Sequence, residues 1–473
     1  MSVRPSQPGW LSGQRLFATP ASIALPVRWF EPRLVLSLGC LICVLIAEGA
    51  AITQSYLWAI PLLCLLFASV AIDLPLVPFL GLSLLVRVLT DDSSSVTARH
   101  SGSIDLSGLI AGLMILVAVG LLLRRRQAAW PALLAALWLG IWTVIAIKTD
   151  GASATTIREG VRETSIVALA VIVFNSRGIL NISLVTRIIQ IVGLAPALLA
   201  LYQLVTHTGF LVGTEIRSNG TFSHPNSAAV FFAVVAMASL WRLVDNGHRR
   251  SDALFTMIYV VATIATFSLG GLASLLVMLV AFGLLRPGSL RLKLGSCAIA
   301  GLVVVAFLAT PLGSERIASE SSTNFGQTSV HGATNNSSLG WRFYKWRTLI
   351  PEWEKSPLFG RGLGTTVTSE GTAANHTAGN PPHSELFRYL VETGAIGLII
   401  LLAALMFLLR ALARRRRIPA TRGVAILGMA IVLGLLVDAV ASNTFLYTPA
   451  AYASALIVAA VLVSPGAVAR AAS

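Results

Sequence analysis

One polar stretch interrupts the long series of apolar runs in this chain and decides how it must fold. The stretch extends from Pro311 to Arg388 and holds two dense blocks, GWRFYKWR at 340–347 and NPPHSEL at 380–386. An apolar run begins directly after it, with VETGAIG at 391–397. Apolar runs long enough for membrane-spanning helices fill most of the chain on both sides. The polar stretch is therefore expected to be a large loop held by a helical membrane scaffold.

The composition is that of an integral membrane protein. Of the 473 residues, 55% are hydrophobic and 12% are charged, and a soluble domain carries about twice that charged share. The formal charge of +15 would indicate a nucleic-acid partner in a soluble protein. In a membrane protein the positive-inside rule accounts for it, so we expect no nucleic-acid partner. The first apolar run starts only near Leu34, which predicts that no signal peptide is present.

The apolar runs predict an all-α polytopic membrane protein with about 12–14 transmembrane helices, given about 17–25 apolar residues per span. One large extracytoplasmic loop would precede the last three helices. The short pairs around Pro75 and Gly270 could instead be re-entrant hairpins. The fourteen candidate spans are 34–52, 57–72, 75–89, 106–123, 130–147, 161–175, 180–205, 226–244, 254–268, 271–285, 294–312, 388–409, 423–441 and 449–464.

The distribution of Lys and Arg predicts the orientation of these spans. With a cytoplasmic N-terminus, the inside segments carry 21 Lys and Arg residues and the short outside loops carry five. Both termini are therefore expected in the cytoplasm. The predicted segments are a cytoplasmic tail at 1–33, N-terminal transmembrane helices at 34–312, a large extracytoplasmic (periplasmic) loop at 313–387, C-terminal transmembrane helices at 388–464 and a cytoplasmic tail at 465–473.

Neither metal nor nucleotide chemistry is expected from the motifs. The spacing of Cys40 and Cys43 is typical of redox or metal sites, but an apolar run removes the exposure that such chemistry needs. The other two cysteines, Cys64 and Cys297, also lie in apolar runs. His376 and His383 are too far apart for a usual zinc motif, and no glycine-rich segment has Walker spacing.

The first polar cluster reads RSNGTFSHPN and covers residues 217–226. Pro225 suits the first turn of a helix, with Ser223 as its cap and Asn226 in the first turn. Arg217 and the free backbone N–H groups would then meet at an outward-facing helix start, which favours an anion. Taken alone, an ordinary capped loop with a snorkelling arginine is the simpler interpretation.

The second cluster lies in the large loop. Arg342, Trp346 and Trp353 recur at near-helical spacing, which predicts an amphipathic helix over 340–355. A helix that merely rests on the membrane surface is an alternative, because Trp and Arg are common there. The alternate glycines in 357–364 indicate a tight turn and are only weak support for phosphate binding.

His383 follows two prolines at the expected start of the next spanning helix. Imidazole has an unperturbed pKa of about 6.5, which suits proton abstraction from a hydroxyl near neutral pH. Glu385 or Glu392 could orient the ring or tune its pKa. The alternative is a purely structural histidine at a helix start.

Three motifs together give a resemblance. They are Arg-x-x-Gly-Thr-Phe-x-His-Pro-Asn at 217–226, Gly-x-Arg-x-x-x-Trp at 340–346 followed by Pro-x-x-Gly-x-Gly-x-Gly at 357–364, and His-Ser, nine residues, Gly-x-x-Gly at 383–397. On these motifs, over about residues 200–410, the chain resembles the O-antigen ligase/polymerase superfamily. These are membrane glycosyltransferases that act on polyprenyl-diphosphate-linked glycans.

The resemblance implies a metal-independent transfer without a cofactor in the bacterial inner (cytoplasmic) membrane, at its outer leaflet. The donor would be a glycan on undecaprenyl diphosphate, and the acceptor a hydroxyl of another glycan or a lipid, among membrane lipids. His383 would be the catalytic base, while Arg342 and Arg217 would hold the diphosphate. Ligase and polymerase differ only in the acceptor, and no motif in the sequence indicates which acceptor is used. The expected substrate-binding residues are Asn226, Trp346, Arg347, Arg361, Ser384 and Glu385.

One feature departs from the family. Its members commonly carry a Ser-Arg pair in the helix after the first motif, but here residues 266–271 read TFSLGG. Arg217, Arg347 or Arg361 would have to replace the missing arginine. A transporter or flippase of lipid-linked saccharides is the alternative function. It would place charges at the bilayer midplane and repeat a motif in both halves, whereas the polar clusters here lie at helix ends.

Overall fold

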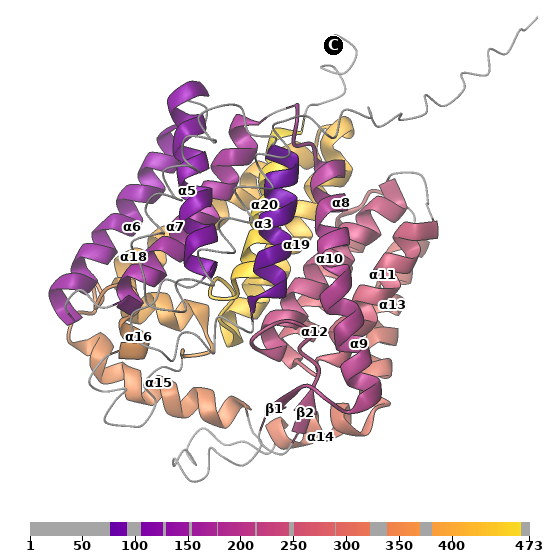
Figure 1. The fold of residues 1–473 in the computed structure, drawn as a ribbon. Coiled ribbons are helices and arrows are strands. Elements are labelled where there is room, and N and C mark those ends of the chain that lie inside the picture. The colour runs from indigo at the N-terminus through magenta and orange to yellow at the C-terminus, as the bar shows by residue number, and fades with distance from the viewer. Residues whose placement is uncertain are drawn as a thin grey trace, which may run out of the picture.

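The computed structural model describes residues 76–91, 106–125, 129–150, 154–176, 178–212, 215–245, 250–288, 290–321, 338–368 and 381–464. The described part is helical apart from one small hairpin and short turns (Figure 1), as expected for an all-α membrane protein. The candidate spans at 34–52 and 57–72 lie outside the described residues. The same holds for the two predicted tails and for Cys40, Cys43 and Cys64.

The first half of the described chain contains eleven helices in sequence up to the large loop, interrupted by the hairpin. Up to the hairpin the elements are α3 (Leu76–Leu89), α5 (Leu106–Arg125), α6 (Ala129–Asp150), α7 (Ala154–Asn175), α8 (Ile182–Val192), α9 (Leu194–Thr206), β1 (Phe210–Val212) and β2 (Glu215–Arg217). From there to the loop they are α10 (Pro225–Asp245), α11 (Arg250–Ala265), α12 (Leu269–Leu285), α13 (Leu290–Leu308) and α14 (Pro311–Ser321).

The second half begins with the described parts of the large loop. These are α15 (Ser338–Glu354), which confirms the helix predicted over 340–355, and the short α16 (Thr365–Thr368). Figure 1 places α14, α15 and the β1–β2 hairpin together at one end of the bundle, at the bottom of the view. The C-terminal elements are α18 (Glu385–Arg416), the 3₁₀ turn η3 (Pro419–Thr421), α19 (Arg422–Ala441) and α20 (Thr448–Val463).

Four described helices are long and apolar enough to cross a membrane. They are Ile182–Thr206, which joins α8 and α9, then Pro225–Asp245, Glu385–Arg416 and Pro419–Ala441. A fifth span would combine α13 with α14, although the two meet at an angle of 92° where the sequence predicted one span at 294–312. The shorter apolar helices are Leu76–Leu89, Ser107–Leu123, Leu134–Thr149, Leu269–Leu285 and Thr448–Val463. The chain is thus a multi-pass membrane protein, and the total of 12–14 spans stays a prediction.

Helix α10 forms the centre of the bundle. It packs against α8, α11, α12, α19 and α20, and nearly all its side chains are buried. Close approach of α12 depends on Gly271, because a Cβ there would overlap the Cβ of Ala229. Small residues commonly let membrane helices approach in this way.

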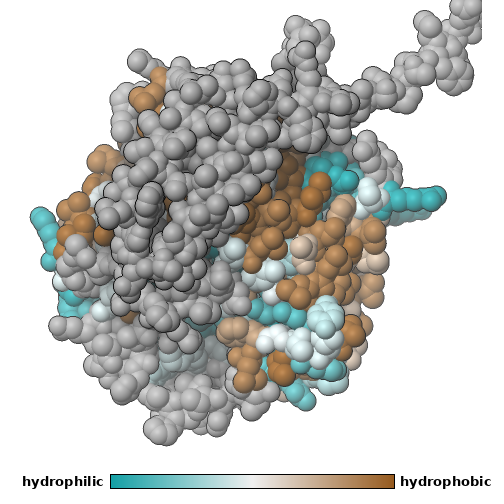
Figure 2. Space-filling model, viewed as in Figure 1, coloured by the Kyte–Doolittle hydropathy of each residue, from teal (hydrophilic) through white to brown (hydrophobic). Residues whose placement is uncertain are grey.

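The outer surface of the helices is apolar. Figure 2 shows hydrophobic side chains gathered over the middle of the described part of the bundle, with hydrophilic residues toward its two ends. Exposed apolar residues include Val205 on α9, Leu302 on α13 and Phe407 on α18, which are 77%, 66% and 67% exposed. Such a surface is stable only against lipid or another apolar partner.

The glycines of the second and third motifs form one backbone contact. Helix α18 is kinked at Gly394, where φ is 68° and ψ is −175°. The segment before α16 lies against this kink, and its Gly362 N–H donates to the Glu392 carbonyl at 2.7 Å while Ala395 N–H donates to the Pro357 carbonyl at 2.9 Å. A Cβ at Gly394 would overlap the carbonyl oxygen of Leu358. The alternate glycines therefore serve close packing, which satisfies the backbone groups that the kink frees.

Candidate functional site

The polar clusters, which are distant in sequence, meet at one end of the bundle. The imidazole rings of His224 and His383 lie 5.8 Å apart between centroids. The charge of Arg342 on α15 acts on both histidines. The turn between α19 and α20 adds Asn443, whose side chain lies 3.2 Å from that of His383. The structure thus brings all three sequence motifs to a single site.

Arg217, at the end of β2, points its side chain at the break between α11 and α12. Its Nε donates to the Thr266 carbonyl at 2.9 Å, and its Nη2 donates to Asn226 Oδ1 at 3.3 Å. The Ser268 hydroxyl donates to the same amide oxygen at 2.8 Å. The guanidinium is therefore held at the TFSLGG segment, where family members commonly carry an arginine. Only 2% of the Arg217 surface is exposed.

Arg347 and Arg361, the other two expected replacements, lie differently. Arg347 is exposed on α15. Arg361 has its Nε 3.6 Å from Glu352 Oε2 and donates its backbone N–H to Val391. Of the three arginines, Arg217 is the one that hydrogen-bonds at the Thr266–Ser268 turn.

The start of α10 corrects the expected cap. Pro225 begins the helix as predicted, but His224 supplies the capping group, because its Nδ1 accepts from Asn226 N–H at 3.1 Å. The Ser223 hydroxyl instead donates to Asp91 Oδ2 at 3.0 Å. A neutral imidazole that accepts at Nδ1 carries its proton on Nε2. His224 is therefore fixed as a structural hydrogen-bond acceptor at Nδ1.

Helix α15 supplies cations and an aromatic support. The Trp346 indole donates to the Pro382 carbonyl at 2.7 Å and stacks on Phe387, with centroids 5.6 Å apart. These contacts hold the residue before His383 in place. Arg342 Nε is buried and has no hydrogen-bond partner among the described residues. Lys345 is fully buried.

The cationic groups of the site are withdrawn from water. Burial lowers the pKa of Arg217 to about 9, with a further contribution from Arg316. Burial also lowers the pKa of Lys345 to about 7 and the pKa of Arg342 below its usual range. Each shift means that the protonated form is destabilised until a negative charge arrives. The arrangement is suited to binding an anion.

His383 has a neutral imidazole in an unusual backbone conformation. Burial, together with the charges of Arg342 and Lys345, lowers the pKa of His383 to about 3. Its φ of 53° lies in the left-handed region, which is uncommon for residues other than glycine. Strain of this kind concentrates at functional sites. Ser384 follows as the cap of α18, since its hydroxyl accepts from Phe387 N–H.

The carboxylates expected to orient His383 do not contact it. Glu385 and Glu392 both bind Arg388, at 2.7 Å from Nε and 2.9 Å from Nη1. The side chain that reaches His383 Nδ1 is Asn443. The expectation failed because Arg388 lies on the same helix, three residues after Glu385 and four before Glu392, so one helical turn brings both carboxylates to Arg388.

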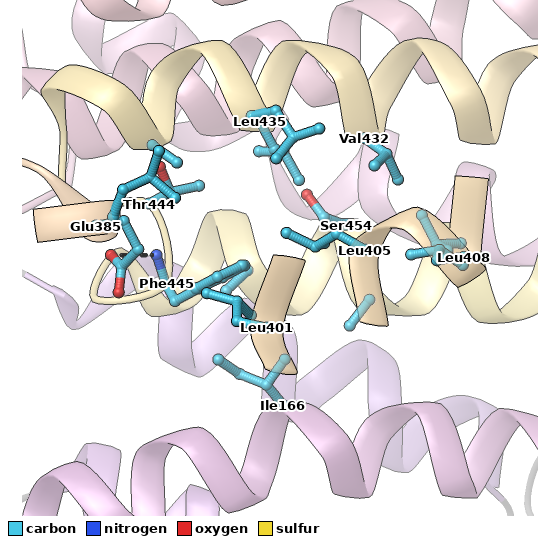
Figure 3. A pocket seen from close by; sticks show the side chains of 16 residues that line it. Ile166, Glu385, Leu401, Leu405, Leu408, Val432, Leu435, Thr444, Phe445 and Ser454 are labelled. Carbon is cyan, nitrogen blue, oxygen red and sulfur yellow. Dashed lines mark hydrogen bonds between the residues drawn. The ribbon is translucent and has the colours of Figure 1, made fainter. Parts of the chain in front are cut away.

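Arg388 collects carboxylates from two helices. Besides Glu385 and Glu392 it binds Glu163 of α7 at 2.6 Å. The second oxygen of Glu385 accepts from Phe445 N–H at 3.0 Å, shown by the dashed line in Figure 3. Glu385 thus ties the start of α18 to the α19–α20 turn. With both oxygens engaged, it is a support for the site and a poor substrate contact.

An apolar cavity of about 140 Å³ lies beside this contact, between α18, α19 and α20. Figure 3 shows Glu385 and Thr444 at one end and Leu401, Leu405 and Leu408 along its length. Among the described residues, no group of three or more His, Cys, Asp or Glu side chains is placed to hold a metal ion.

Four residues of the site were not singled out from the sequence. His224 and Lys345 lie within the first and second motifs, but only the tertiary structure shows that they lie near His383. Asn443 and Tyr447 come from a short turn, and Tyr447 hydrogen-bonds with Asn226. The available signal was the polar triplet 442–444 between two apolar runs.

The fold and the site define a class of protein: a helical multi-pass membrane protein with a buried, cationic site at one end of the bundle. Residues 253–402 match the family model described as O-Antigen ligase. This match over part of the chain supports a relation to the O-antigen ligase/polymerase superfamily, whose members are glycosyltransferases. The match includes Arg342 and His383, whereas Arg217, Asn226 and Asn443 lie outside it. No curated protein matches the chain.

Proposed function

We propose that the protein transfers a glycan from undecaprenyl diphosphate to a hydroxyl of an acceptor glycan or lipid, without a metal ion, at the outer leaflet of the membrane. His383 is the base, and Arg217 and Arg342 hold the diphosphate. The family supports a transferase that uses a lipid-linked glycan donor. The identity of the lipid, the leaflet and the residue roles are our proposal.

The observation that carries the proposal is the unbalanced positive charge. Among the described residues, Arg217 hydrogen-bonds only to neutral oxygens, those of Thr266 and Asn226. Arg342 has a buried Nε without a partner among the described residues. Buried charges in proteins are normally paired, so these two guanidinium groups require an anion for their full stabilisation. A diphosphate supplies it and fits the planar donor fork of arginine.

The transfer then proceeds as an inverting displacement. The acceptor oxygen forms a bond to the anomeric carbon while the bond from that carbon to the diphosphate oxygen breaks. The hydroxyl proton passes to His383, and the electron pair of the broken bond stays on the departing diphosphate. Arg217 and Arg342 stabilise the charge that develops there, which is the main way in which a fixed cation accelerates such a step.

Donor binding also prepares the base. In the free protein the charges of Arg342 and Lys345 help to lower the pKa of His383 to about 3, so imidazole is neutral but weakly basic. A bound diphosphate offsets these charges and raises the pKa of His383 toward the pH of the medium. The base therefore gains strength only when the donor is present.

The direct test is transfer in proteoliposomes that contain purified lipid-linked donor and acceptor. His383→Ala is expected to lower transfer by about 10²–10⁴-fold, the usual effect of one positioned base, while donor binding changes little. His207→Ala is the matched control, because exposed His207 has a similar left-handed φ of 51°. Equal transfer by folded His383→Ala and wild-type protein would refute the base assignment.

The same vesicles separate the transferase from a flippase and test for a metal. A flippase would move labelled donor between leaflets without forming a product, and His383→Ala would leave that movement intact. Transfer that persists in EDTA is expected, since no metal participates in the proposed step. Loss of transfer in EDTA that added magnesium or manganese restores would contradict the metal-independent mechanism.

A further inference from the structure

Asn443 is the hydrogen-bonding partner of the proposed base. It lies in the turn between α19 and α20 and is 1% exposed. Its Nδ2 is 3.2 Å from His383 Nδ1. Its Oδ1 is buried and has no hydrogen-bond partner among the described residues. A buried amide oxygen without a donor is destabilising.

Rotation of the amide by 180° exchanges its oxygen and nitrogen at nearly the same positions. Two arrangements are therefore compatible with the 3.2 Å contact. With Nδ2 toward the ring, His383 accepts at Nδ1 and carries its proton on Nε2. With Oδ1 toward the ring, His383 donates from Nδ1, and Nε2 has a free electron pair. The second arrangement gives the buried Oδ1 its missing donor.

The two tautomers have opposite chemical roles. Because Nδ1 is occupied by Asn443, only Nε2 remains to meet an acceptor hydroxyl. A proton on Nε2 would make His383 a donor and prevent it from abstracting the hydroxyl proton. Only the arrangement with Oδ1 toward the ring leaves a base at Nε2.

We propose that Asn443 is a positioning residue that accepts the Nδ1–H of His383 and thereby holds the ring in the tautomer with Nε2 free. This inference rests on the proposed function, in which His383 is the base. When Nε2 takes the hydroxyl proton, the ring becomes an imidazolium and its hydrogen bond from Nδ1 to Oδ1 strengthens. The same logic applies to other histidine bases that a third group orients.

The turn that carries Asn443 is fixed at several points. The Tyr447 N–H donates to the Asn443 carbonyl at 3.1 Å, and Glu385 N–H donates to the Ser442 carbonyl at 2.9 Å. Glu385 Oε2 accepts from Phe445 N–H. The amide of Asn443 thus has a rigid support and loses little entropy when it holds the ring.

Two substitutions test the acceptor role. Asn443→Ala removes the acceptor, so kcat is expected to fall by roughly 10²-fold or more while the KM for the donor changes by less than about threefold. Asn443→Asp keeps an acceptor at the same place and is expected to restore most of the rate. Asn175→Ala is the control: Asn175 is equally buried and donates to the Val171 carbonyl within its own helix α7.

The pH profile gives a readout that a merely structural role would not move. The charged and titratable groups that act on His383 are Arg342 and Lys345 on α15 and His224 before α10. A carboxylate at position 443 adds a negative charge beside the ring and favours imidazolium. The acid limb of the kcat profile should therefore move upward by about 1–3 pH units in Asn443→Asp. Equal rates and equal pH profiles for the wild type, Asn443→Ala and Asn443→Asp would overturn the proposal.

The tautomer can also be measured without activity. The ¹⁵N shifts of the two ring nitrogens differ according to which one carries the proton, and His383→Gln assigns the signals among the seven histidines. We expect Nδ1 to be protonated in the wild type and the ring to lose this preference in Asn443→Ala. A proton on Nε2 in the wild type would overturn the proposal. Wild-type protein with Nδ1 protonated but no transfer would instead refute the proposed function and leave the tautomer assignment standing.

Discussion

Two arginines, Arg217 and Arg388, are both almost completely buried, but their surroundings are opposite. Arg388 binds the carboxylates of Glu163, Glu385 and Glu392. Arg217 binds the neutral oxygens of Thr266 and Asn226 and forms no ion pair with any described residue. One guanidinium is therefore surrounded by carboxylates, whereas the other forms no ion pair among the described residues, although the charge of Glu215 acts on it.

This difference separates scaffold from site. A buried arginine surrounded by carboxylates joins helices, here α7 and α18. Its charge and its N–H donors are already paired, so it is not expected to bind a ligand. A buried arginine held only by neutral groups has a fixed position and a positive charge without an ion-pair partner. Recognition of an anion requires both properties. Arg388 therefore supports the loop that carries His383, and Arg217 is the group expected to meet the diphosphate.

Removal of Arg388 is expected to have the largest effect on folding. Arg388→Met leaves three buried carboxylates without their cation, and breaking a buried ion pair in this way costs about 3–5 kcal/mol. The expected result is a large decrease in the unfolding temperature in detergent. Glu392→Gln, which removes one negative charge and keeps the shape, should have a smaller effect. An unchanged unfolding temperature for Arg388→Met would show that the cluster is not structural.

Arg217→Met is expected to give the reverse pattern. Transfer should fall by about 10²–10³-fold, the effect of removing one group that stabilises developing charge. The free energy of unfolding should stay the same or rise, because replacing an unpaired buried charge by an apolar side chain is often neutral or stabilising. Steady-state transfer and thermal unfolding of the same preparation measure both. Normal transfer would mean that another cation holds the donor.

The kink that supports the scaffold region should tolerate no side chain. Gly394→Ala places a Cβ at φ 68° against the carbonyl of Leu358, and left-handed strain alone costs about 1–3 kcal/mol. Gly112→Ala in α5 is the control, because outside the backbone of its own helix no described atom lies within 4 Å of the added Cβ. A lowered unfolding temperature in Gly394→Ala only is expected. Equal unfolding temperatures would show that the contact at the kink is loose.

The smallest expected effect is a separation of two pH profiles. The acid limb of kcat/KM reports the free enzyme, in which the pKa of His383 is about 3. The acid limb of kcat reports the donor complex, in which the diphosphate raises this pKa. Since the base must be unprotonated, activity is lost as pH falls through each value. The limb of kcat should therefore lie at least about one unit above that of kcat/KM, and coinciding limbs would contradict activation by the donor.

The sequence by itself determined the class of the protein and selected the groups proposed to carry its chemistry. Length and polarity of the apolar runs are local properties, and they predicted the helices as well as the loop helix α15. Motif spacing selected Arg342 and His383, both within the matched domain, together with Arg217. The helix predictions succeeded because each depends on residues close together in the chain, whereas the roles of the three site residues stay predictions.

Only the tertiary structure decided which of these groups are paired and which are free. Arg388 finds Glu163 across 225 positions, Arg217 reaches Thr266 across 49, and Asn443 reaches His383 across 60. The sequence suggested Glu385 and Glu392 as partners of His383 because they are near it in the chain, but both bind Arg388 one turn away on their own helix α18, and it is the contact with Glu163 that depends on tertiary structure. Charge pairing depends on distance in space, and helix packing sets that distance.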